Sequence, residues 1–348
     1  MSRLQLKLHK IFHWEYWPME FIYYPIFPVW LFFAIKARSF FFFNAANPSI
    51  KNGGMAMESK MEIYDIIPDQ YIPNTILVEK GMSVAAALKK IETAEISFPM
   101  IAKPDIGMKA FGVDRIKNEK DLQAYINRTS NDFLIQELIP YKNEVGIFYV
   151  RYPHEKKGRI TSIVSKEFLS VLGDGQHTIV ELIKQTPRSY FQLASLKKKF
   201  GDKLNSVLKD GEEFILVPYG SHTRGAKFVD KTYKTNKKLT DTINAICTQI
   251  PDFYYGRLDI LHTTIDDLAE GKNFSIIEIN GAGSEPTHIY DPKHSILFAW
   301  KEIIRHWSML NQISILNHKT GHGGYLSFKE GLSMLKENSK LEEKIKMI

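Results

Sequence analysis

The chain has 348 residues, of which 44% are hydrophobic and 24% are charged, close to the average of globular proteins. These values exclude intrinsic disorder, a collagen-like fibre and a disulfide scaffold, and the length allows two lobes with a sizeable core. Lys and Arg (46) outnumber Asp and Glu (39), which suits an anionic ligand or an anionic membrane surface.

The basic residues and the cysteine content bear on nucleic-acid binding and on disulfide formation. Because the basic residues are scattered and no nucleic-acid-binding module is recognised, nucleic acid is not an expected partner. The single cysteine, Cys247, rules out an internal disulfide and is consistent with a cytoplasmic protein.

The N-terminal region, residues 1–54, is unusually aromatic. Residues 12–43 hold 15 of the chain's 43 aromatic residues (22 Phe, 16 Tyr and 5 Trp). The longest uncharged run, residues 21–35, contains Pro25 and Pro28 and is shorter than the roughly 20 residues of a membrane-spanning helix. No cleavage site typical of a secretory signal follows it. Three interpretations stay open for residues 12–43: a segment packed on the body of the protein, a peripheral membrane anchor, or a lid over the substrate.

Beyond a loop rich in Asn, Pro and Gly at residues 44–54, helical and extended patterns alternate irregularly. We expect helices over residues 55–67, 84–93, 119–128, 179–185, 189–200, 237–250 and 294–308, and a solvated helix within 330–346. We expect strands over residues 74–78, 98–103, 133–139, 144–152, 159–168, 213–218, 257–262 and 274–280. The mixed order predicts an α+β fold rather than a βαβ repeat.

Two polar pairs lie on the last two predicted strands. Arg257 and Asp259 are two residues apart and therefore share one face, as do Glu278 and Asn280. If these strands form an antiparallel hairpin, the side chains of Asp259, Glu278 and Asn280 converge as three oxygen donors, which suit a hard cation such as Mg²⁺ together with phosphates. Simple decoration of strand ends would bury Glu278 and Asn280 without partners. The pattern therefore favours a metal site.

A second set of residues suits a nucleotide. Lys103 closes an apolar strand before a loop with Gly107 and Gly112, where a lysine, loop amides and Lys109 can meet phosphate oxygens. Glu137 and Glu144 suit the amino group of a purine and the hydroxyls of a ribose. Taken singly, each of these residues fits a solvated surface charge equally well.

In this order, the motifs resemble the ATP-grasp superfamily, and within it the D-alanine–D-alanine ligases. The resemblance covers about residues 55–294, and the family's first nucleotide lysine is matched by Lys60, ahead of Pro73-Asn74-Thr75. It implies an ATP-grasp fold of two α+β lobes: a small lobe (55–140), a large lobe with the metal site (141–310), and a C-terminal helical tail (311–348). The aromatic segment, residues 1–54, replaces the usual N-terminal α/β domain.

The same resemblance implies a role for each matched residue. Around ATP it places Lys60, Lys103, Gly107, Gly112, Glu137, Leu138, Ile139 and Glu144; around Mg²⁺ or Mn²⁺ it places Asp259, Glu278 and Asn280. Near the transferred phosphate it places Arg257, with Lys166 as a helper, and backbone amides around Gly281 and Gly283 would meet the developing oxyanion.

A further resemblance lies between these motifs. Residues 171–179 (VLGDGQHTI) are similar to a segment of cyanophycin synthetases and of fused-type glutathione synthetases, and residues 221–226 with Asp230 are similar to their loop before the metal strands. Without the resemblance, Asp174-Gly175 indicates only a tight turn of the hairpin kind. The chain departs from D-alanine–D-alanine ligases in its poorer glycine loop and in the run 281–288 after Asn280.

The implied activity is an ATP-dependent carboxylate–amine ligase that forms an amide bond through an acyl phosphate, with an amino acid or peptide among its acid and amine substrates. Two alternatives stay open: an ATP-grasp kinase that phosphorylates a hydroxyl, and a membrane-surface binding protein with an inactive ATP-grasp body. The sequence makes no prediction of oligomeric state.

Overall fold

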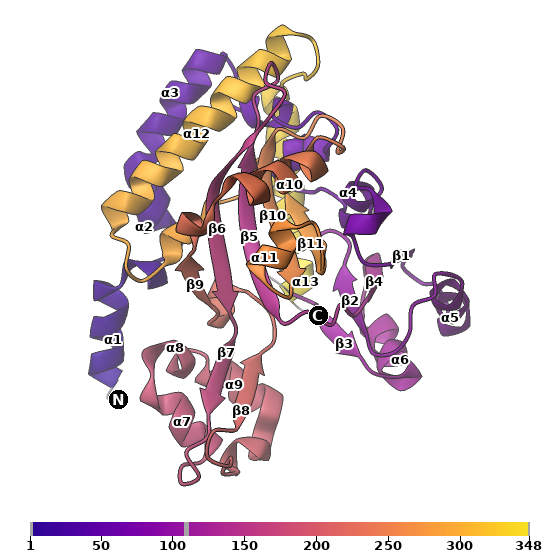
Figure 1. Ribbon diagram of the computed structural model, residues 1–348, viewed down its shortest axis with the longest axis vertical. Helices are drawn as coiled ribbons and strands as arrows, with labels where there is room; N and C mark the ends of the chain where they lie inside the picture. Colours follow the sequence, from indigo (N-terminus) through magenta and orange to yellow (C-terminus); the bar gives the residue numbers. More distant parts are fainter. Residues whose placement is uncertain (1–2, 108–110, 347–348) are drawn as a thin grey trace.

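The computed structural model describes residues 3–107 and 111–346. Three antiparallel sheets organise it: five strands at the centre, four in a small lobe on one side, and two in an insertion at one end (Figure 1). Helices and antiparallel strands are interleaved, so the predicted α+β fold with two lobes is confirmed.

The central sheet has the order β11-β10-β5-β6-β9. Its strands are β5 (Asn143–Val150), β6 (Arg159–Glu167), β9 (Lys227–Asp230), β10 (Tyr255–His262) and β11 (Phe274–Asn280). Because side chains alternate along a strand, Ile147 and Tyr149 of β5 join the core beneath α10 (Lys237–Cys247) and α11 (Ile265–Ala269). Phe148 and Val150 join the core on the opposite face.

The small lobe has the sheet order β1-β4-β2-β3. Its elements are β1 (Thr75–Val78), α5 (Val84–Thr93), β2 (Met100–Pro104), β3 (Asp114–Ile116), α6 (Glu119–Arg128) and β4 (Phe133–Glu137). Ser83 and Asn118 cap the two helices, each accepting a backbone N–H through its side chain. The helix expected over residues 55–67 is shorter: α4 (Lys60–Tyr64) starts at its cap, Ser59.

An insertion projects from the large lobe as a small sheet with helices. Its elements are β7 (Leu169–Leu172), α7 (Ile179–Gln185), α8 (Pro187–Tyr190), α9 (Leu193–Phe200) and β8 (Glu213–Val217). The turn predicted at Asp174-Gly175 leads into α7, which has the bounds expected for the helix over residues 179–185. The Asp174 carboxylate accepts the backbone N–H groups of Gln176 and His177, and Thr178 then caps α7 in a capping box with Glu181.

The N-terminal segment folds as short helices against a long C-terminal helix (Figure 1). The helices are α1 (Arg3–Phe12), α2 (Met19–Tyr23) and α3 (Phe27–Ala37), followed by Phe41, Phe42 and Phe43, which are fully buried; α12 (Ile296–Lys319) runs beside α3. The side-chain amides of Asn311 and Asn317 on α12 donate to the carbonyls of Phe33 and Ala45. Within residues 12–43, the buried residues Trp14, Ile22, Ile26, Phe33 and Phe41–Phe43 pack on the body of the protein, as the first of the three interpretations expects.

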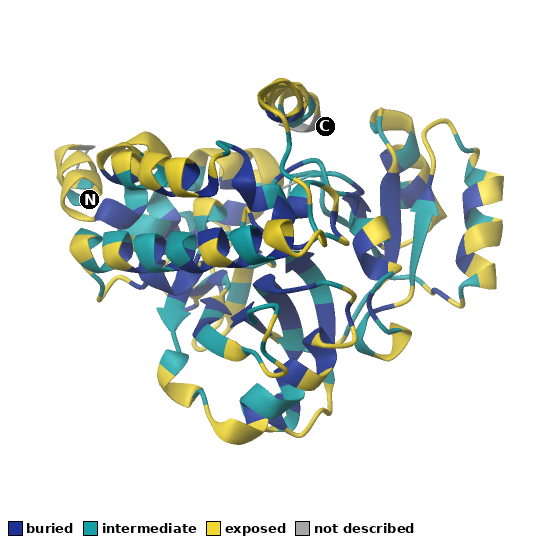
Figure 2. Ribbon diagram, turned by 90° about the horizontal axis from the view of Figure 1, so that it is seen from above, coloured by how far each residue is buried: buried dark blue, intermediate teal, exposed yellow. Residues whose placement is uncertain are grey.

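The C-terminal end differs from the predicted domain division. The helix expected over residues 294–308 is longer, because α12 continues across the expected boundary at residue 310 to Lys319. Only α13 (Phe328–Lys346) forms the tail, and Met334 is buried against the rest of the chain. Figure 2 shows that most of α13 and of the outer N-terminal helices is exposed, whereas the central strands are buried.

Within the described residues, one run, Met19–Ala37, is long and apolar enough to cross a membrane, and 22% of it is buried. A helix packed on the core of a protein can have the same length and composition as a membrane-spanning helix of this kind. The run is divided between α2, a 3₁₀ turn at Tyr24–Ile26 and α3.

Residues 44–57, which we call the strap, connect the aromatic segment to the small lobe and lie against the end of β10. Asn47 is completely buried and makes four hydrogen bonds. Its amide donates to the carbonyls of Gly53 (3.0 Å) and Tyr255 (2.8 Å), and its oxygen accepts the N–H groups of Tyr254 (2.9 Å) and Tyr255 (3.0 Å). The loop expected at residues 44–54 is therefore anchored to the core through Asn47.

Candidate active site

One face of the central sheet collects the charged residues that the sequence singled out. In the antiparallel register, Asp259 lies opposite Glu278 on β11 and Arg257 lies opposite Asn280. On the other side of β10, Asp259 lies opposite Gly146 of β5, where a Cβ would come within 3.2 Å of the Arg257 and Asp259 side chains. The hairpin that the sequence predicted thus forms, and glycine leaves room for its polar side chains.

Asp259 is the centre of a buried ion-pair cluster. Arg257 donates to it twice, from Nε to Oδ1 (2.9 Å) and from Nη2 to Oδ2 (3.0 Å). The Nζ of Lys166 lies 3.1 Å from Asp259 Oδ1 and 2.6 Å from Glu144 Oε1. Glu144 also accepts the backbone N–H of Gly220 (3.1 Å). Lys166 thereby connects Glu144, the expected ribose ligand, to the expected metal ligand Asp259.

Electrostatics favour the charged forms of Asp259 and Lys166. Burial by itself would raise the pKa of Asp259, but the adjacent Arg257 and Lys166 outweigh it and keep that pKa below its usual range. Burial would likewise lower the pKa of Lys166, yet Asp259 and Glu144 raise it instead. Asp259 and its two cationic partners, Arg257 and Lys166, are therefore all charged at neutral pH.

The expected metal ligands can be tested against this geometry. Among the described residues, no group of three or more His, Cys, Asp or Glu side chains is arranged to hold a metal ion, so a cation here needs the Asn280 oxygen besides Asp259 and Glu278. All three donors are oxygens, as Mg²⁺ and Mn²⁺ prefer. The Nδ2 of Asn280 is buried without an acceptor, which a phosphate oxygen would supply. The residues therefore fit a divalent cation bound together with a phosphate.

Two lysines of the small lobe face the same strand. Lys60, at the start of α4, donates to the carbonyls of Gly107 (2.8 Å) and Asp105 (3.2 Å), and its Nζ lies 4.0 Å from Glu278 Oε1. Lys103, at the end of β2, donates to the carbonyl of Ile277 on β11 (3.2 Å). Both cations are thus placed between the two lobes beside Glu278.

Lys103 is held in a nearly dry pocket. Besides Ile277 it donates to the Tyr64 hydroxyl (2.8 Å) and to Gln136 Oε1 (3.0 Å), and only 8% of the residue is exposed. Burial lowers the pKa of Lys103 to about 8, although the nearby carboxylates of Glu278 and Asp105 oppose that shift. A phosphate at this position would favour the charged form.

The structure does not bring every expected residue into this cluster. Glu137 is exposed and lies on the opposite face of β4 from Gln136, and its carboxylate accepts the Asn74 N–H (3.4 Å). Leu138 and Ile139 follow the strand and are partly buried. Their expected contacts with adenine stay predictions.

Gly107 and Gly112, the two glycines expected to bind phosphate, make different contacts. Gly107 is joined to Lys60 through its carbonyl, and Gly112, at φ = 69°, accepts the Tyr125 hydroxyl (2.7 Å). The intervening loop, with Lys109, lies outside the described residues.

Gly283 does not fit the expected oxyanion role in this structure. Its N–H donates to the carbonyl of Gly54 (2.9 Å), and the N–H of Ala282 donates to Gly53 (2.9 Å). A Cβ at Gly283 would lie 2.6 Å from the Met55 carbonyl oxygen. The glycine is therefore required where the strap packs against the loop after β11, and its amide is already occupied.

Several residues at the site were missed from the sequence. Gln136 and Tyr64 complete the Lys103 pocket, and a polar residue inside the apolar run of β4 was the available signal for Gln136. Glu285 accepts the hydroxyls of Tyr23 and Tyr290, and its backbone carbonyl accepts Arg257 Nη1 (3.4 Å). The aromatic segment therefore reaches the Arg257 end of the cluster.

The loop that resembles glutathione synthetases also contacts the aromatic segment. His222 lies 3.1 Å from Glu15 Oε2, and Arg188 of α8 contacts the same carboxylate (2.5 Å). Arg224 lies 4.9 Å from the ring of Phe111, at the end of the glycine loop. These contacts join the N-terminal helices, the insertion and the small lobe.

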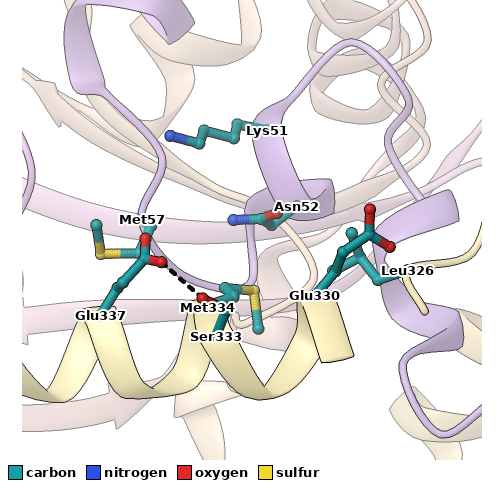
Figure 3. A pocket seen from close by; sticks show the side chains of 8 residues that line it. All are labelled: Lys51, Asn52, Met57, Leu326, Glu330, Ser333, Met334 and Glu337. Carbon is teal, nitrogen blue, oxygen red and sulfur yellow. Dashed lines mark hydrogen bonds between the residues drawn. The ribbon is translucent and has the colours of Figure 1, made fainter. Parts of the chain in front are cut away.

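A pocket of about 220 Å³ lies elsewhere, between the strap and α13. Figure 3 shows its lining side chains: Lys51, Asn52, Met57, Leu326, Glu330, Ser333, Met334 and Glu337. The Ser333 hydroxyl donates to Glu337 within the helix (2.8 Å). None of the residues singled out in the sequence lines this pocket.

No protein-family model matches the chain, and neither does any curated protein. Among solved structures, it is similar to a D-alanine–D-alanine ligase from Bacillus anthracis (12% identity, 76% of this chain and 68% of that chain, TM-score 0.42). It is also similar to the VanG D-Ala:D-Ser ligase from Enterococcus faecalis (13%, 77% and 64%, TM-score 0.43).

A third similar structure is a bifunctional glutathione synthetase from Pasteurella multocida (14% identity, 74% of this chain, TM-score 0.39). The chain spans only 38% of that protein's length. At these identities, the chemistry has to be inferred from this chain's own side chains.

Proposed function

We propose that this chain is an ATP-dependent carboxylate–amine ligase of the ATP-grasp type, acting on an amino acid or a peptide. The proposal rests on one observation: the lysines of the small lobe lie next to the buried ion pairs of the central sheet. Lys60 and Lys103 of the small lobe face Glu278, and Asp259 on the adjacent strand holds Arg257 and Lys166. Such a set is suited to a triphosphate and a divalent cation between two lobes.

In this proposal, the small lobe binds the nucleotide. Lys60 and Lys103 bind the α- and β-phosphates as charge-assisted hydrogen-bond donors. Each of them now donates to backbone carbonyls, contacts that phosphate oxygens would replace with stronger ones. Asp259, Glu278 and Asn280 would hold Mg²⁺ or Mn²⁺, which supplies charge neutralisation on the β- and γ-phosphates when bound.

The large lobe would handle the transfer. A substrate carboxylate oxygen forms a bond to the γ-phosphorus while the bond to the bridging oxygen breaks and ADP leaves. An amine then forms the C–N bond, a proton is released from it, and the bond from the acyl carbon to the phosphate oxygen breaks. Because both reactants of the first step are anionic, the main task is to hold them together and neutralise charge, which Arg257 and Lys166 would do.

The test is phosphate release from Mg-ATP across a panel of amino acids and short peptides, with identification of the product. Free phosphate together with an amide supports the ligase, whereas a stable phosphoester would identify a kinase. Calorimetry with Mg-ATP should show binding by the wild type and its loss in Lys103→Ala. A well-folded wild type that does not bind Mg-ATP would refute the proposal.

A further inference from the structure

The first 35 residues expose an unusual amount of apolar surface. Of the 19 large hydrophobic residues that are exposed in the described part of the chain, 11 lie between Leu4 and Ile35. The largest exposures there are those of Phe12 (78%) and Ile35 (77%). Isolated exposed hydrophobic residues are ordinary, but so many within one short segment of the chain indicate an interaction surface.

These residues are arranged in stripes. On α3, Phe27, Leu31, Phe32 and Ile35 are exposed, at the spacing of one helical face, while Phe33, Ala34 and Ala37 are buried towards α12. On α1, Leu4, Leu8, Ile11 and Phe12 form a similar stripe. We call these two stripes the outer apolar face.

Exposed cations adjoin both stripes in the sequence. Lys7 and Lys10 lie on α1, and Lys36 and Arg38 lie at the end of α3. Within residues 4–38, all of which are described, the two acidic residues differ: Glu20 is exposed, whereas Glu15 is buried and paired with Arg188 and His222. An apolar stripe bordered by cations is complementary to the interface of an anionic bilayer, where acyl chains lie below phosphate groups.

We propose that α1, α2 and α3 bind the surface of an anionic lipid bilayer and lie in its plane, with the outer apolar face in the interfacial layer. A transmembrane arrangement conflicts with the packing. Ile22, Ile26 and Phe33 lie within the membrane-length run and are at most 6% exposed, because they pack on other parts of the chain. Spanning would remove them from that core, whereas in-plane binding leaves every buried contact intact.

Vesicle co-sedimentation of the full chain tests this surface. The vesicles are phosphatidylcholine alone, or phosphatidylcholine and phosphatidylserine in equal parts. We expect binding to the anionic vesicles that weakens as salt is raised, since the lysine contribution is screened. The apolar variant is Phe12→Ser/Phe32→Ser/Ile35→Ser, which should lose about tenfold in affinity per side chain.

Matched controls separate this surface from general effects. Leu172→Ser/Val207→Ser/Tyr233→Ser removes the same number of exposed hydrophobic side chains outside the N-terminal helices and should bind vesicles like the wild type. Lys7→Glu/Lys10→Glu should weaken binding at least about 25-fold, from about fivefold per lysine, whereas Lys117→Glu/Lys120→Glu should not. The charge pair also serves if the apolar variant does not fold.

Three results would overturn the proposal. One is a wild type that remains in the supernatant with anionic vesicles. Another is an equal loss of binding in the controls and the variants. The third is a wild-type dimer in analytical ultracentrifugation that ignores vesicles and dissociates in the apolar variant, which would assign the outer apolar face to a second copy of the chain.

Discussion

Replacing Asn47 by alanine should destabilise the protein more than any other single amide deletion in the strap. The substitution removes four hydrogen bonds from a completely buried residue. The Gly53 carbonyl keeps the N–H of Ala282, whereas the carbonyl of Tyr255 and the N–H groups of Tyr254 and Tyr255 lose this partner. A buried polar group that loses its partner costs about 1–3 kcal/mol. Allowing for partial relief by water, we expect the free energy of unfolding to fall by about 4 kcal/mol.

Urea unfolding followed by circular dichroism measures this change. The matched control is Asn127→Ala on α6, where the exposed amide oxygen accepts from Gln123, and its free energy of unfolding should change by less than about 0.5 kcal/mol. A loss below about 1 kcal/mol in Asn47→Ala would refute the reasoning. It would mean that the strap is not held to β10 by this side chain.

Three further predictions concern the site. Because burial lowers the pKa of Lys103 to about 8, its charge is lost as pH rises through that value, and the Kd for ATP, measured by calorimetry, should rise several-fold between about pH 8 and 9. Glu278→Ala should lower phosphate release at saturating ATP by at least about 100-fold, with little change in melting temperature because a third (33%) of the side chain is exposed. Gly283→Ala should lower the free energy of unfolding by about 1–3 kcal/mol, because its Cβ would lie 2.6 Å from the Met55 carbonyl oxygen.

Each of these has its own control. The pH dependence should disappear in Lys103→Arg, whose guanidinium stays charged throughout this range, and its persistence there would assign it to another group. For Glu278, the control is Glu213→Ala at the exposed start of β8, which should retain full turnover; equal losses in both variants would contradict a specific role. Gly324→Ala, which meets nothing within 4 Å, should be neutral, and a similar loss there would show that the Gly283 effect is not steric.

The charged face of the central sheet was predictable because it depends only on alternation along a strand. Arg257 with Asp259, and Glu278 with Asn280, had to share faces once β10 and β11 formed, and the register then brought the two pairs together. The end points of β11 also agree with the prediction, since apolar residues and turn signals bound it clearly. This part of the site could therefore be predicted from local periodicity in the sequence.

Contacts between distant segments could not be predicted in that way. Asn47 contacts residues 207 and 208 positions away, and no local pattern distinguishes it from an asparagine in a loop. Gln136 and Glu137 are adjacent in β4, so their side chains lie on opposite faces of the sheet. Assigning the polar contact to Glu137 instead of Gln136 therefore placed it on the wrong face. Gly283 was expected to donate to substrate, but its tight packing against Met55 depends on the tertiary position of the strap.

The pairing of α3 with α12 has a consequence for synthesis of the protein. Asn311 donates to the carbonyl of Phe33 across 278 positions of sequence, so the partner of this apolar helix is translated long after it. At about 5–20 residues per second, the interval is roughly 15 to 55 seconds. Throughout that time this apolar helix lacks its native cover, which makes it a substrate for chaperones and a place where aggregation can begin.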